Sequence, residues 1–418
     1  MPRLSPSTSE TIRDPVFSRF FTGITIANIG QFLQNLAVPF LVKDLTDSNA
    51  WVGAASFAVL LPAVIGTPVA GILADRVNRK TILLSAYVLQ CALSVAFISL
   101  YETGQLTPWR ILMLQFCTGV LGGFQWAPIQ SMSAVLVEPR LLIDAVRLIS
   151  ISFTAGRTIG PAIAAVLLVT SGPGLAFIGT LGCYVVATVF VATVRLTHTP
   201  IQTNERFLSQ FFSGIHYIRQ RVAMRLAMVT QAVIAFFAAV FTFALTASIA
   251  DDAYGVGGGG LGALAMFSGL GSIVGTIYIT GPGSSVRRSN IQIIAITTYA
   301  TGVLIGAATP YLAVGLAGFF FLGAAHMLSA VNLSTALQVQ VDEGYRGRVM
   351  SVWLMVTLAF LPISALIGGF LADVFHIRVV MAIFGSALLV FVVVRASVGT
   401  GFTLLDELVT TPESDAQV

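Results

Sequence analysis

The chain has 418 residues, of which 56% are hydrophobic and only 10% are charged, and its mean hydropathy is +0.89. A soluble domain carries about 25% charged residues, so this composition excludes a soluble protein and indicates that lipid surrounds the chain. The net charge of +4 does not indicate nucleic-acid binding, because the basic residues gather in short segments between apolar runs. The cysteines lie inside apolar runs and indicate neither a disulfide framework nor a metal site.

Apolar runs long enough to cross a membrane follow one another along the whole chain. A membrane-spanning helix needs about 20 apolar residues, and the first run is too long for a cleaved signal peptide. We therefore expect the first run to remain as a membrane helix. The predicted spans are 18–42, 51–74, 81–101, 109–137, 145–170, 174–195, 226–250, 258–280, 289–308, 311–339, 348–372 and 376–397.

The longest interruption divides these spans into two sets of six. The sequence thus predicts an all-α membrane protein with twelve transmembrane helices in two pseudo-symmetric six-helix bundles. We expect the bundles at 1–195 and 226–400, a cytoplasmic linker at 196–225, and a disordered cytoplasmic tail at 401–418.

The basic residues predict the orientation. With a cytoplasmic N-terminus, all of the 22 Lys and Arg residues except Lys43, Arg110, Arg157 and Arg378 lie in the tails or in cytoplasmic loops. Cytoplasmic loops carry an excess of Lys and Arg. Both termini are therefore expected in the cytoplasm.

The stretch 71–80, with the sequence GILADRVNRK, concentrates charge between the second and third spans. Such charges must lie at a membrane surface, because burying them in hydrocarbon is costly. The stretch resembles the signature loop of the major facilitator superfamily, G-x-L-A-D-R-x-G-R-K. Asn78 stands where that family usually has Gly, and we expect Asn to supply the positive φ of a tight turn.

This resemblance implies a gate on the cytoplasmic side. Asp75 would meet the partly positive N-terminal end of span 11, a contact that stabilises by about 0.3–1 kcal/mol. Arg76 and Arg79 would hold the gate. The residues predicted for the gating motif are Gly71, Asp75, Arg76, Arg79, Lys80, Arg346 and Arg348.

Span 5 contains the stretch GRTIGP at 156–161, which resembles the G-x-x-x-G-P segment of antiporters in the superfamily. Gly156, Gly160 and Pro161 are predicted to serve close helix packing, and plain packing without a link to export is the alternative. Arg157 lies near the middle of the span, where a charge usually faces a cavity or a partner. Its role is either functional or structural.

The 196–225 link contains a helical pattern of apolar residues, namely Phe207, Leu208, Phe211, Phe212, Ile215 and Ile218. The pattern predicts an amphipathic helix in the cytoplasmic interface. This helix either holds the two halves together or regulates the protein.

A repeat is visible at an offset of 208 residues, where Arg79-Lys80 falls on Arg287-Arg288. Matched basic loops in two six-span halves suggest duplicated halves around a central cavity. Spans 1, 4, 7 and 10 line that cavity in the superfamily. The residues predicted to bind substrate or couple protons are Asn28, Gln31, Asn35, Gln125, Trp126, Arg157, Gln231, His326 and Asn332.

Neutral amides and aromatic rings suit a bulky, partly apolar ligand, although each amide could instead bond to a neighbouring helix. The predicted spans contain no Asp or Glu. His326 is then the midplane group with a suitable ordinary pKa for proton coupling, and Asp75 at the interface is the other candidate.

Further stretches in span 1, in span 5, in the linker helix and before span 11 resemble the enterobactin-exporter and macrolide-efflux branch of the superfamily. The resemblance implies a bacterial inner-membrane exporter, a proton-coupled antiporter that moves a siderophore or drug by alternating access. An importer or a lysolipid flippase on the same fold is the alternative. The chain shows no residue cluster typical of a membrane enzyme. We expect a monomer in the lipid bilayer that has no metal and no cofactor and binds no nucleic acid.

Overall fold

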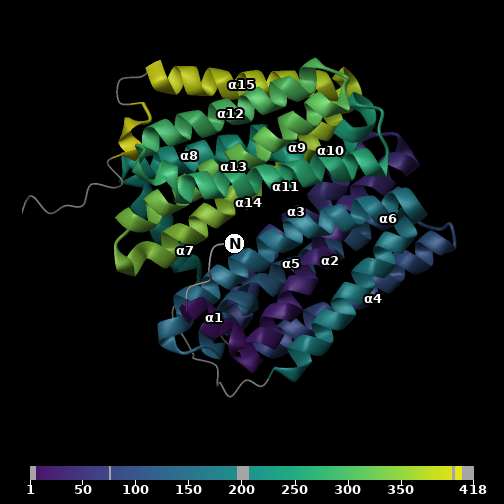
Figure 1. Cartoon of the computed structure of the whole chain (residues 1–418), viewed down its shortest axis with the longest axis horizontal. Coiled ribbons are helices and arrows are strands. Elements are labelled where there is room, and N and C mark those ends of the chain that lie inside the picture. The colour runs from purple at the N-terminus through teal and green to yellow at the C-terminus, as the bar shows by residue number, and fades with distance from the viewer. Residues whose placement is uncertain (1–5, 75–76, 195–206, 398–400, 407–418) are drawn as a thin grey trace, which may run out of the picture. The chain divides into compact units, whose positions relative to one another are not determined.

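The computed structural model describes residues 6–74, 77–194, 207–397 and 401–406, and every regular element in these ranges is a helix (Figure 1). The chain divides into two compact units. Unit 1 is Met1–Asn204 with Gly257–Gly262, and unit 2 is Glu205–Val256 with Ala263–Val418. The division falls inside the predicted linker, so the linker helix belongs to unit 2.

Unit 1 is a bundle in which α2 packs against α6, α3 against α5, and α4 against both α5 and α6. Asp14 caps α2, since its carboxylate accepts hydrogen bonds from the backbone N–H groups of Val16 and Phe17 at 2.8 Å. The helices are α1 (Pro6–Arg13), α2 (Pro15–Thr46), α3 (Asn49–Ala74), α4 (Arg79–Glu102), α5 (Pro108–Leu136), the short η1 (Pro139–Leu141) and α6 (Leu142–Thr193).

Helix α6 contains two membrane-spanning segments. As one straight helix its 52 residues would extend about 78 Å, far beyond a hydrocarbon core of about 30 Å. The helix is broken at Gly172, whose φ of 74° is left-handed and favours glycine. This break lies between the fifth and sixth predicted spans.

Unit 2 contains the remaining helices apart from the first residues of α11, up to Gly262, and within it α12 lies beside both α13 and α15 (Figure 1). They are α7 (Phe207–Arg219), α8 (Val222–Phe237), α9 (Ala239–Phe243), α10 (Thr246–Ser248), the π-helical η2 (Ile249–Ala253), α11 (Gly258–Thr280), η3 (Pro282–Ser285), α12 (Arg288–Ala308), α13 (Leu312–Gln340), α14 (Glu343–Phe375), α15 (Ile377–Ser397) and η4 (Thr403–Leu405).

The seventh predicted span is not one continuous helix. It is interrupted at Ala238 and again before Thr246. The Ser364 hydroxyl donates to the Phe236 carbonyl beside the first break, and the Thr246 hydroxyl donates to the Phe241 carbonyl at 2.8 Å beside the second. Inside a membrane, freed backbone carbonyls need such partners, so these hydroxyls stabilise the interruptions.

Among the described residues, nine helices are long and apolar enough to cross a membrane. One of these nine is α6, which covers two predicted spans. Helices α5 and α8 lie on two further predicted spans but do not belong to the nine. The all-helical membrane fold is confirmed, and the count of twelve stays a prediction.

The first residues of the predicted disordered tail are ordered, which corrects that part of the prediction. Phe402 and Leu405 are buried, and η4 packs against α8 and α12. The Asp406 carboxylate accepts hydrogen bonds from the Ser289 backbone N–H at 2.9 Å and from its hydroxyl at 2.7 Å. Two apolar side chains and a helix cap are enough to dock this segment. The rest of the tail, 407–418, lies outside the described residues.

Candidate functional site

In unit 1, the predicted amides of α2 share one half-buried face. Asn28, Gln31 and Asn35 have the spacing of one helical face, and all three are partly exposed. The Asn28 side-chain amide donates to the Ser152 hydroxyl of α6 at 2.9 Å. The side chain of Gln31 extends toward Gly122 of α5. This face therefore borders both α5 and α6.

Three aromatic rings adjoin this face, and the sequence had singled out only one of them. Phe153 of α6 makes edge contacts with Phe32 of α2, at 5.2 Å between ring centroids, and with Trp126 of α5, at 5.7 Å. All three rings are half-buried. Phe32 follows Asn28 by four residues, and Phe153 precedes Arg157 by four. A search for aromatic neighbours at helical i+4 spacing would have found both.

The glycines of span 5 lie where α6 meets α2. A Cβ atom on Gly156 would lie 2.7 Å from the Cβ of Asn28, and one on Gly160 would lie 2.8 Å from the Ile29 carbonyl oxygen. Pro161 follows at a buried position inside α6, and Arg157 is half-buried. The absence of side chains at these two glycines brings Asn28 and the turn that carries Arg157 together.

Gln125 takes a different position from its neighbour Trp126. Its side chain is buried inside unit 1, where it lies beside Tyr184. Of the two residues predicted on α5, only Trp126 contributes to the half-buried face.

In unit 2, His326 of α13 lies between residues of two other helices. Its Nδ1 atom is 3.0 Å from the Tyr299 hydroxyl of α12, and its ring makes an edge contact with Phe243 of α9 at 5.3 Å. His326 is half-buried, whereas Tyr299 is fully buried. The hydroxyl fixes the orientation of the imidazole, and Phe243 places it beside the interrupted span. Neither partner was predicted from the sequence.

Asn332, six residues further along α13, is part of a buried polar network. Its side-chain amide donates to the Arg288 carbonyl at 3.0 Å and to Gln292 Oε1 at 3.1 Å, and its oxygen accepts from the Arg288 guanidinium at 3.4 Å. Gln292 in turn donates to Ser329 at 2.8 Å. These contacts favour the interhelical role that the sequence had left open for Asn332. Gln231 of α8 is also buried, and its Oε1 has no hydrogen-bond partner among the described residues.

The predicted gating loop is only partly described. Gly71 lies in the last turn of α3, whereas Asp75 and Arg76 lie outside the described residues. Arg79 begins α4, and the Lys80 ammonium donates to the Ala192 carbonyl at 2.7 Å. That carbonyl belongs to the last turn of α6, where a cation is favourable.

The expectation of a positive φ at Asn78 is wrong. Its φ is −57°, and its side chain accepts a hydrogen bond from the Lys80 backbone N–H at 2.9 Å. Asn78 is the N-cap of α4, a position that Asn favours because its short side chain can satisfy a free N–H group.

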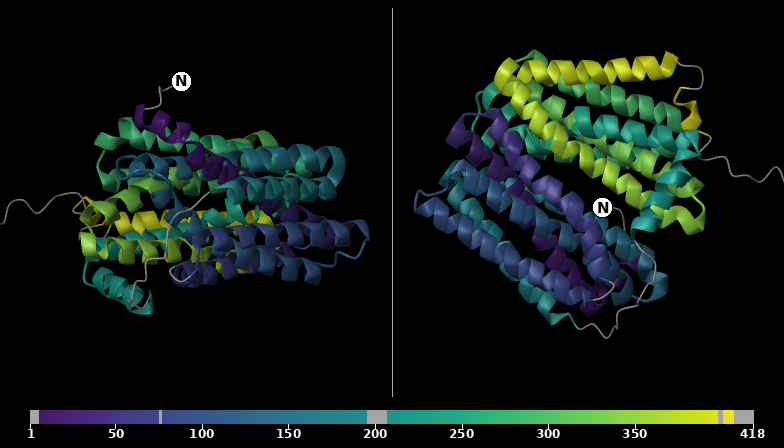
Figure 2. Two further views of the ribbon diagram at one scale, coloured as in Figure 1. Left: turned by 90° about the horizontal axis from the view of Figure 1, so that it is seen from below. Right: turned by 180° about the vertical axis from the view of Figure 1, so that it is seen from behind.

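The remaining gating residues lie at the start of the eleventh predicted span, and α7 contacts one of them. Arg346 is exposed. The Arg348 guanidinium donates to the Ser213 hydroxyl of α7 at 3.1 Å and lies 5.3 Å from the centre of the Tyr345 ring. Both views of Figure 2 show α7 beside the first turns of α14.

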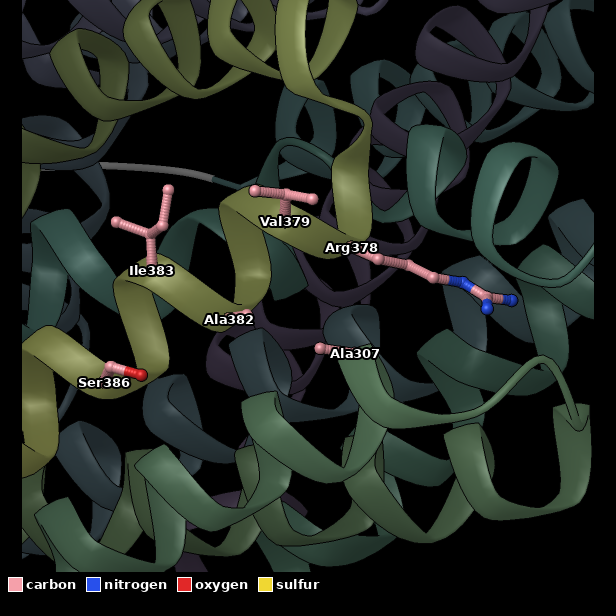
Figure 3. A pocket seen from close by; sticks show the side chains of 6 residues that line it. All are labelled: Ala307, Arg378, Val379, Ala382, Ile383 and Ser386. Atoms are coloured by element: carbon pink, nitrogen blue, oxygen red, sulfur yellow. The ribbon is translucent and has the colours of Figure 1, made fainter.

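A groove of about 600 Å³ lies on unit 2 between α12 and α15 (Figure 3). Its lining is mostly apolar and contains none of the predicted site residues. The Arg378 side chain extends away from the other lining residues, and its guanidinium donates to the Ala253 carbonyl. Val379 and Ile383 are about half exposed, which is typical of a surface that faces lipid.

Comparison with known proteins identifies the family. The chain matches the sequence profile of MFS_3, described as a transmembrane secretion effector, over residues 6–412. The chain belongs to this family of major facilitator superfamily transporters. Family and fold are those of membrane transporters, not enzymes, and the protein is a multi-pass membrane protein.

Individual relatives agree with this assignment. The chain is 24% identical over 370 residues to the enterobactin exporter EntS of Escherichia coli O1:K1 / APEC, covering 85% of each chain. It is 24% identical over 384 residues to the uncharacterized MFS-type transporter YfiS of Bacillus subtilis (strain 168), covering 87% of this chain and 88% of YfiS. Its fold resembles that of a bacterial homolog to the human lysosomal transporter Spinster, with a TM-score of 0.73 at 15% identity over 97% and 98% of the two chains.

Proposed function

We propose that this protein is a secondary active exporter that moves a small amphipathic compound, a siderophore or a drug, out of the cytoplasm by alternating access. The observation that carries the proposal is the similarity to an enterobactin exporter along 85% of both chains, within a family of secretion effectors. The bacterial inner membrane, cytoplasmic termini, a monomeric state and proton antiport are parts of the same proposal.

The half-buried face of unit 1 is the proposed substrate surface. Asn28, Gln31 and Asn35 offer amide donors and acceptors, and Phe32, Trp126 and Phe153 offer ring surface beside them. A few polar groups among aromatic rings suit a bulky ligand that is itself partly apolar. Arg157 would attract an anionic group of the ligand, because a guanidinium binds oxyanions through several N–H donors.

His326 is the proposed coupling residue. An ordinary histidine titrates near pH 6.5, so small changes in its surroundings alter its charge at physiological pH. The Tyr299 hydroxyl at 3.0 Å would hold the ring while its other nitrogen exchanges a proton. The gating residues would act at the cytoplasmic side, with Asp75 as the anion that closes it.

Everted membrane vesicles test both direction and coupling. An exporter in everted vesicles accumulates candidate siderophores or drugs inside when the vesicle interior is acidified, and export releases protons to the medium. His326→Gln should abolish the proton signal, Arg157→Ala should weaken substrate binding, and His376→Gln, at an exposed histidine, should change neither. Asp75→Asn should abolish net export while the protein remains folded in the membrane.

Accumulation only in right-side-out vesicles would instead indicate an importer. Movement of lysolipid between leaflets, with no accumulation of other compounds, would indicate a flippase. Substrate binding with no proton signal in the wild type would remove His326 from the coupling role.

A further inference from the structure

One face of α7 is fixed to α14 by specific contacts. The Tyr217 ring stacks on the Tyr345 ring with 4.5 Å between centroids, and a Cβ on Gly214 would lie 2.8 Å from the Arg348 carbonyl oxygen. The Arg221 guanidinium lies 3.6 Å from the centre of the Tyr217 ring and 3.5 Å from the Asp342 carboxylate. Because these contacts fix the rotation of α7 about its axis, its opposite face is presented in a defined direction.

That opposite face combines an aromatic ring with cations. Phe212, His216 and Arg219 follow one another at i, i+4 and i+7, which places them on one side of the helix. The Phe212 side chain is 64% exposed, and both His216 and Arg219 are exposed. Arg225, in the first turns of the adjoining α8, is also exposed.

The charge of this surface is positive. Neither α7 nor α8 contains an Asp or Glu. The Asp342 carboxylate, which lies against α7, already accepts from Tyr217 and faces Arg221. The cations at Arg219 and Arg225 therefore face no described carboxylate of their own helices.

The position of α7 along the chain places it at the depth of lipid headgroups. It ends at Arg219, shortly before the seventh predicted span, and its docking partners Asp342 and Tyr345 directly precede the eleventh. An amphipathic helix with an exposed ring and Arg residues at that depth is suited to a negatively charged membrane surface. We propose that the exposed face of α7, with Arg225, binds anionic phospholipid of the adjacent leaflet, with Phe212 inserted among the acyl chains and the two arginines on the phosphates.

Native mass spectrometry of the full-length protein in a mild non-ionic detergent tests this proposal. The protein is titrated with phosphatidylglycerol and, separately, with phosphatidylethanolamine, and the bound lipids are counted. The double variant Arg219→Gln/Arg225→Gln should retain about 10-fold less phosphatidylglycerol with unchanged phosphatidylethanolamine. Phe212→Ser should lower retention of both lipids. Arg110→Gln, which removes an exposed arginine at the start of α5, should change neither.

Equal retention of phosphatidylglycerol by the wild type and the double variant would overturn the proposal. So would a parallel loss of both lipids in the double variant, because the arginines would then not recognise charge. The same spectra report oligomeric state. A wild-type dimer that dissociates in Phe212→Ser while lipid retention is unchanged would assign the face to a second copy of the chain instead.

Discussion

The Tyr217 hydroxyl both donates to and accepts from Asp342. It donates to the carboxylate oxygen Oδ2 at 2.8 Å and accepts from the Asp342 backbone N–H at 3.2 Å. Asp342 is the residue that precedes the first turn of α14, and its own side chain makes no capping bond there. Burial raises the pKa of the Tyr217 hydroxyl, so the group stays protonated at physiological pH and can make both bonds.

Tyr217→Phe should loosen α7 without displacing the ring that stacks on Tyr345. The loss of two hydrogen bonds should lower the free energy of local unfolding of α7 by about 1–3 kcal/mol. Hydrogen exchange of the α7 amides should accelerate by about 5- to 100-fold. Tyr345→Phe is the matched control, because it also removes a tyrosine hydroxyl from the stack, one that makes no hydrogen bond to the described residues. Equal exchange rates in the two variants would show that the two hydrogen bonds of the Tyr217 hydroxyl do not hold the helix.

Helices α4 and α12 both have their second backbone N–H group capped by a side chain, but the capping residue comes from a different part of the chain in each case. The second N–H group of α4 is bound by Asn78, which directly precedes the helix, and the second N–H group of α12 is bound by Asp406 from the C-terminal segment. These helices begin at the two basic pairs related by the repeat. Both helices thus have a side-chain cap on the second N–H group, but the caps come from different parts of the chain.

Removing either cap should lower stability by a similar amount. Asn78→Ala and Asp406→Ala should each cost about 1 kcal/mol, which lowers the melting temperature by about 2–4 °C for a unit of this size. Thermal unfolding of the purified protein measures both. Asp44→Ala, an exposed carboxylate near the end of α2, should leave the melting temperature unchanged. A drop for Asn78→Ala alone would show that the Asp406 cap contributes nothing to stability.

Most of the fold follows from the sequence, because membrane helices carry their signal locally. The spacing of Phe and Ile in the linker predicted α7 nearly to its ends, and the composition around Gly172 marked the break in α6. The interruption of span 7 could not be predicted, because Ala238 is a good helix former and the apolar pattern continues through it. Tertiary contacts stabilise the broken backbone, since the Ser364 hydroxyl of α14 binds the Phe236 carbonyl and the Phe384 ring of α15 packs against Phe236 and Phe241.

The candidate site was only partly predictable for the same reason. Asn28, Gln31 and Asn35 were placed on one face by helical periodicity alone. Periodicity cannot say how neighbouring helices are rotated, so the contacts of Phe153 with Phe32 and Trp126 were missed. Gln125 and Asn332 have the same polarity as the face residues but are buried within their own bundles.

Gly156→Ala should destabilise unit 1 although alanine favours helices. The added Cβ would lie 2.7 Å from the Asn28 Cβ and 2.8 Å from its carbonyl carbon, so α6 and α2 would have to separate at a cost of about 1–3 kcal/mol. The yield of monodisperse protein in fluorescence-detected size-exclusion chromatography should fall. Gly182→Ala is the matched control in the same helix, because its Cβ would meet nothing within 4 Å. If both variants behave alike, close packing at Gly156 is not needed.

Tyr299→Phe should separate coupling from substrate binding. The substitution keeps the buried ring but removes the hydroxyl 3.0 Å from His326 Nδ1, and one such bond is worth about 1 kcal/mol. If His326 couples protons, substrate-evoked proton release should fall by about 5- to 10-fold, while equilibrium binding of the same substrate stays near the wild-type value. Tyr278→Phe on α11, a partly exposed tyrosine, should leave both quantities unchanged. Loss of binding together with proton release would place Tyr299 and His326 on the ligand instead. If proton release and substrate binding both keep their wild-type values, the pair has a structural role. Tyr299 then serves only as the hydrogen-bond partner of His326 where α9, α12 and α13 meet.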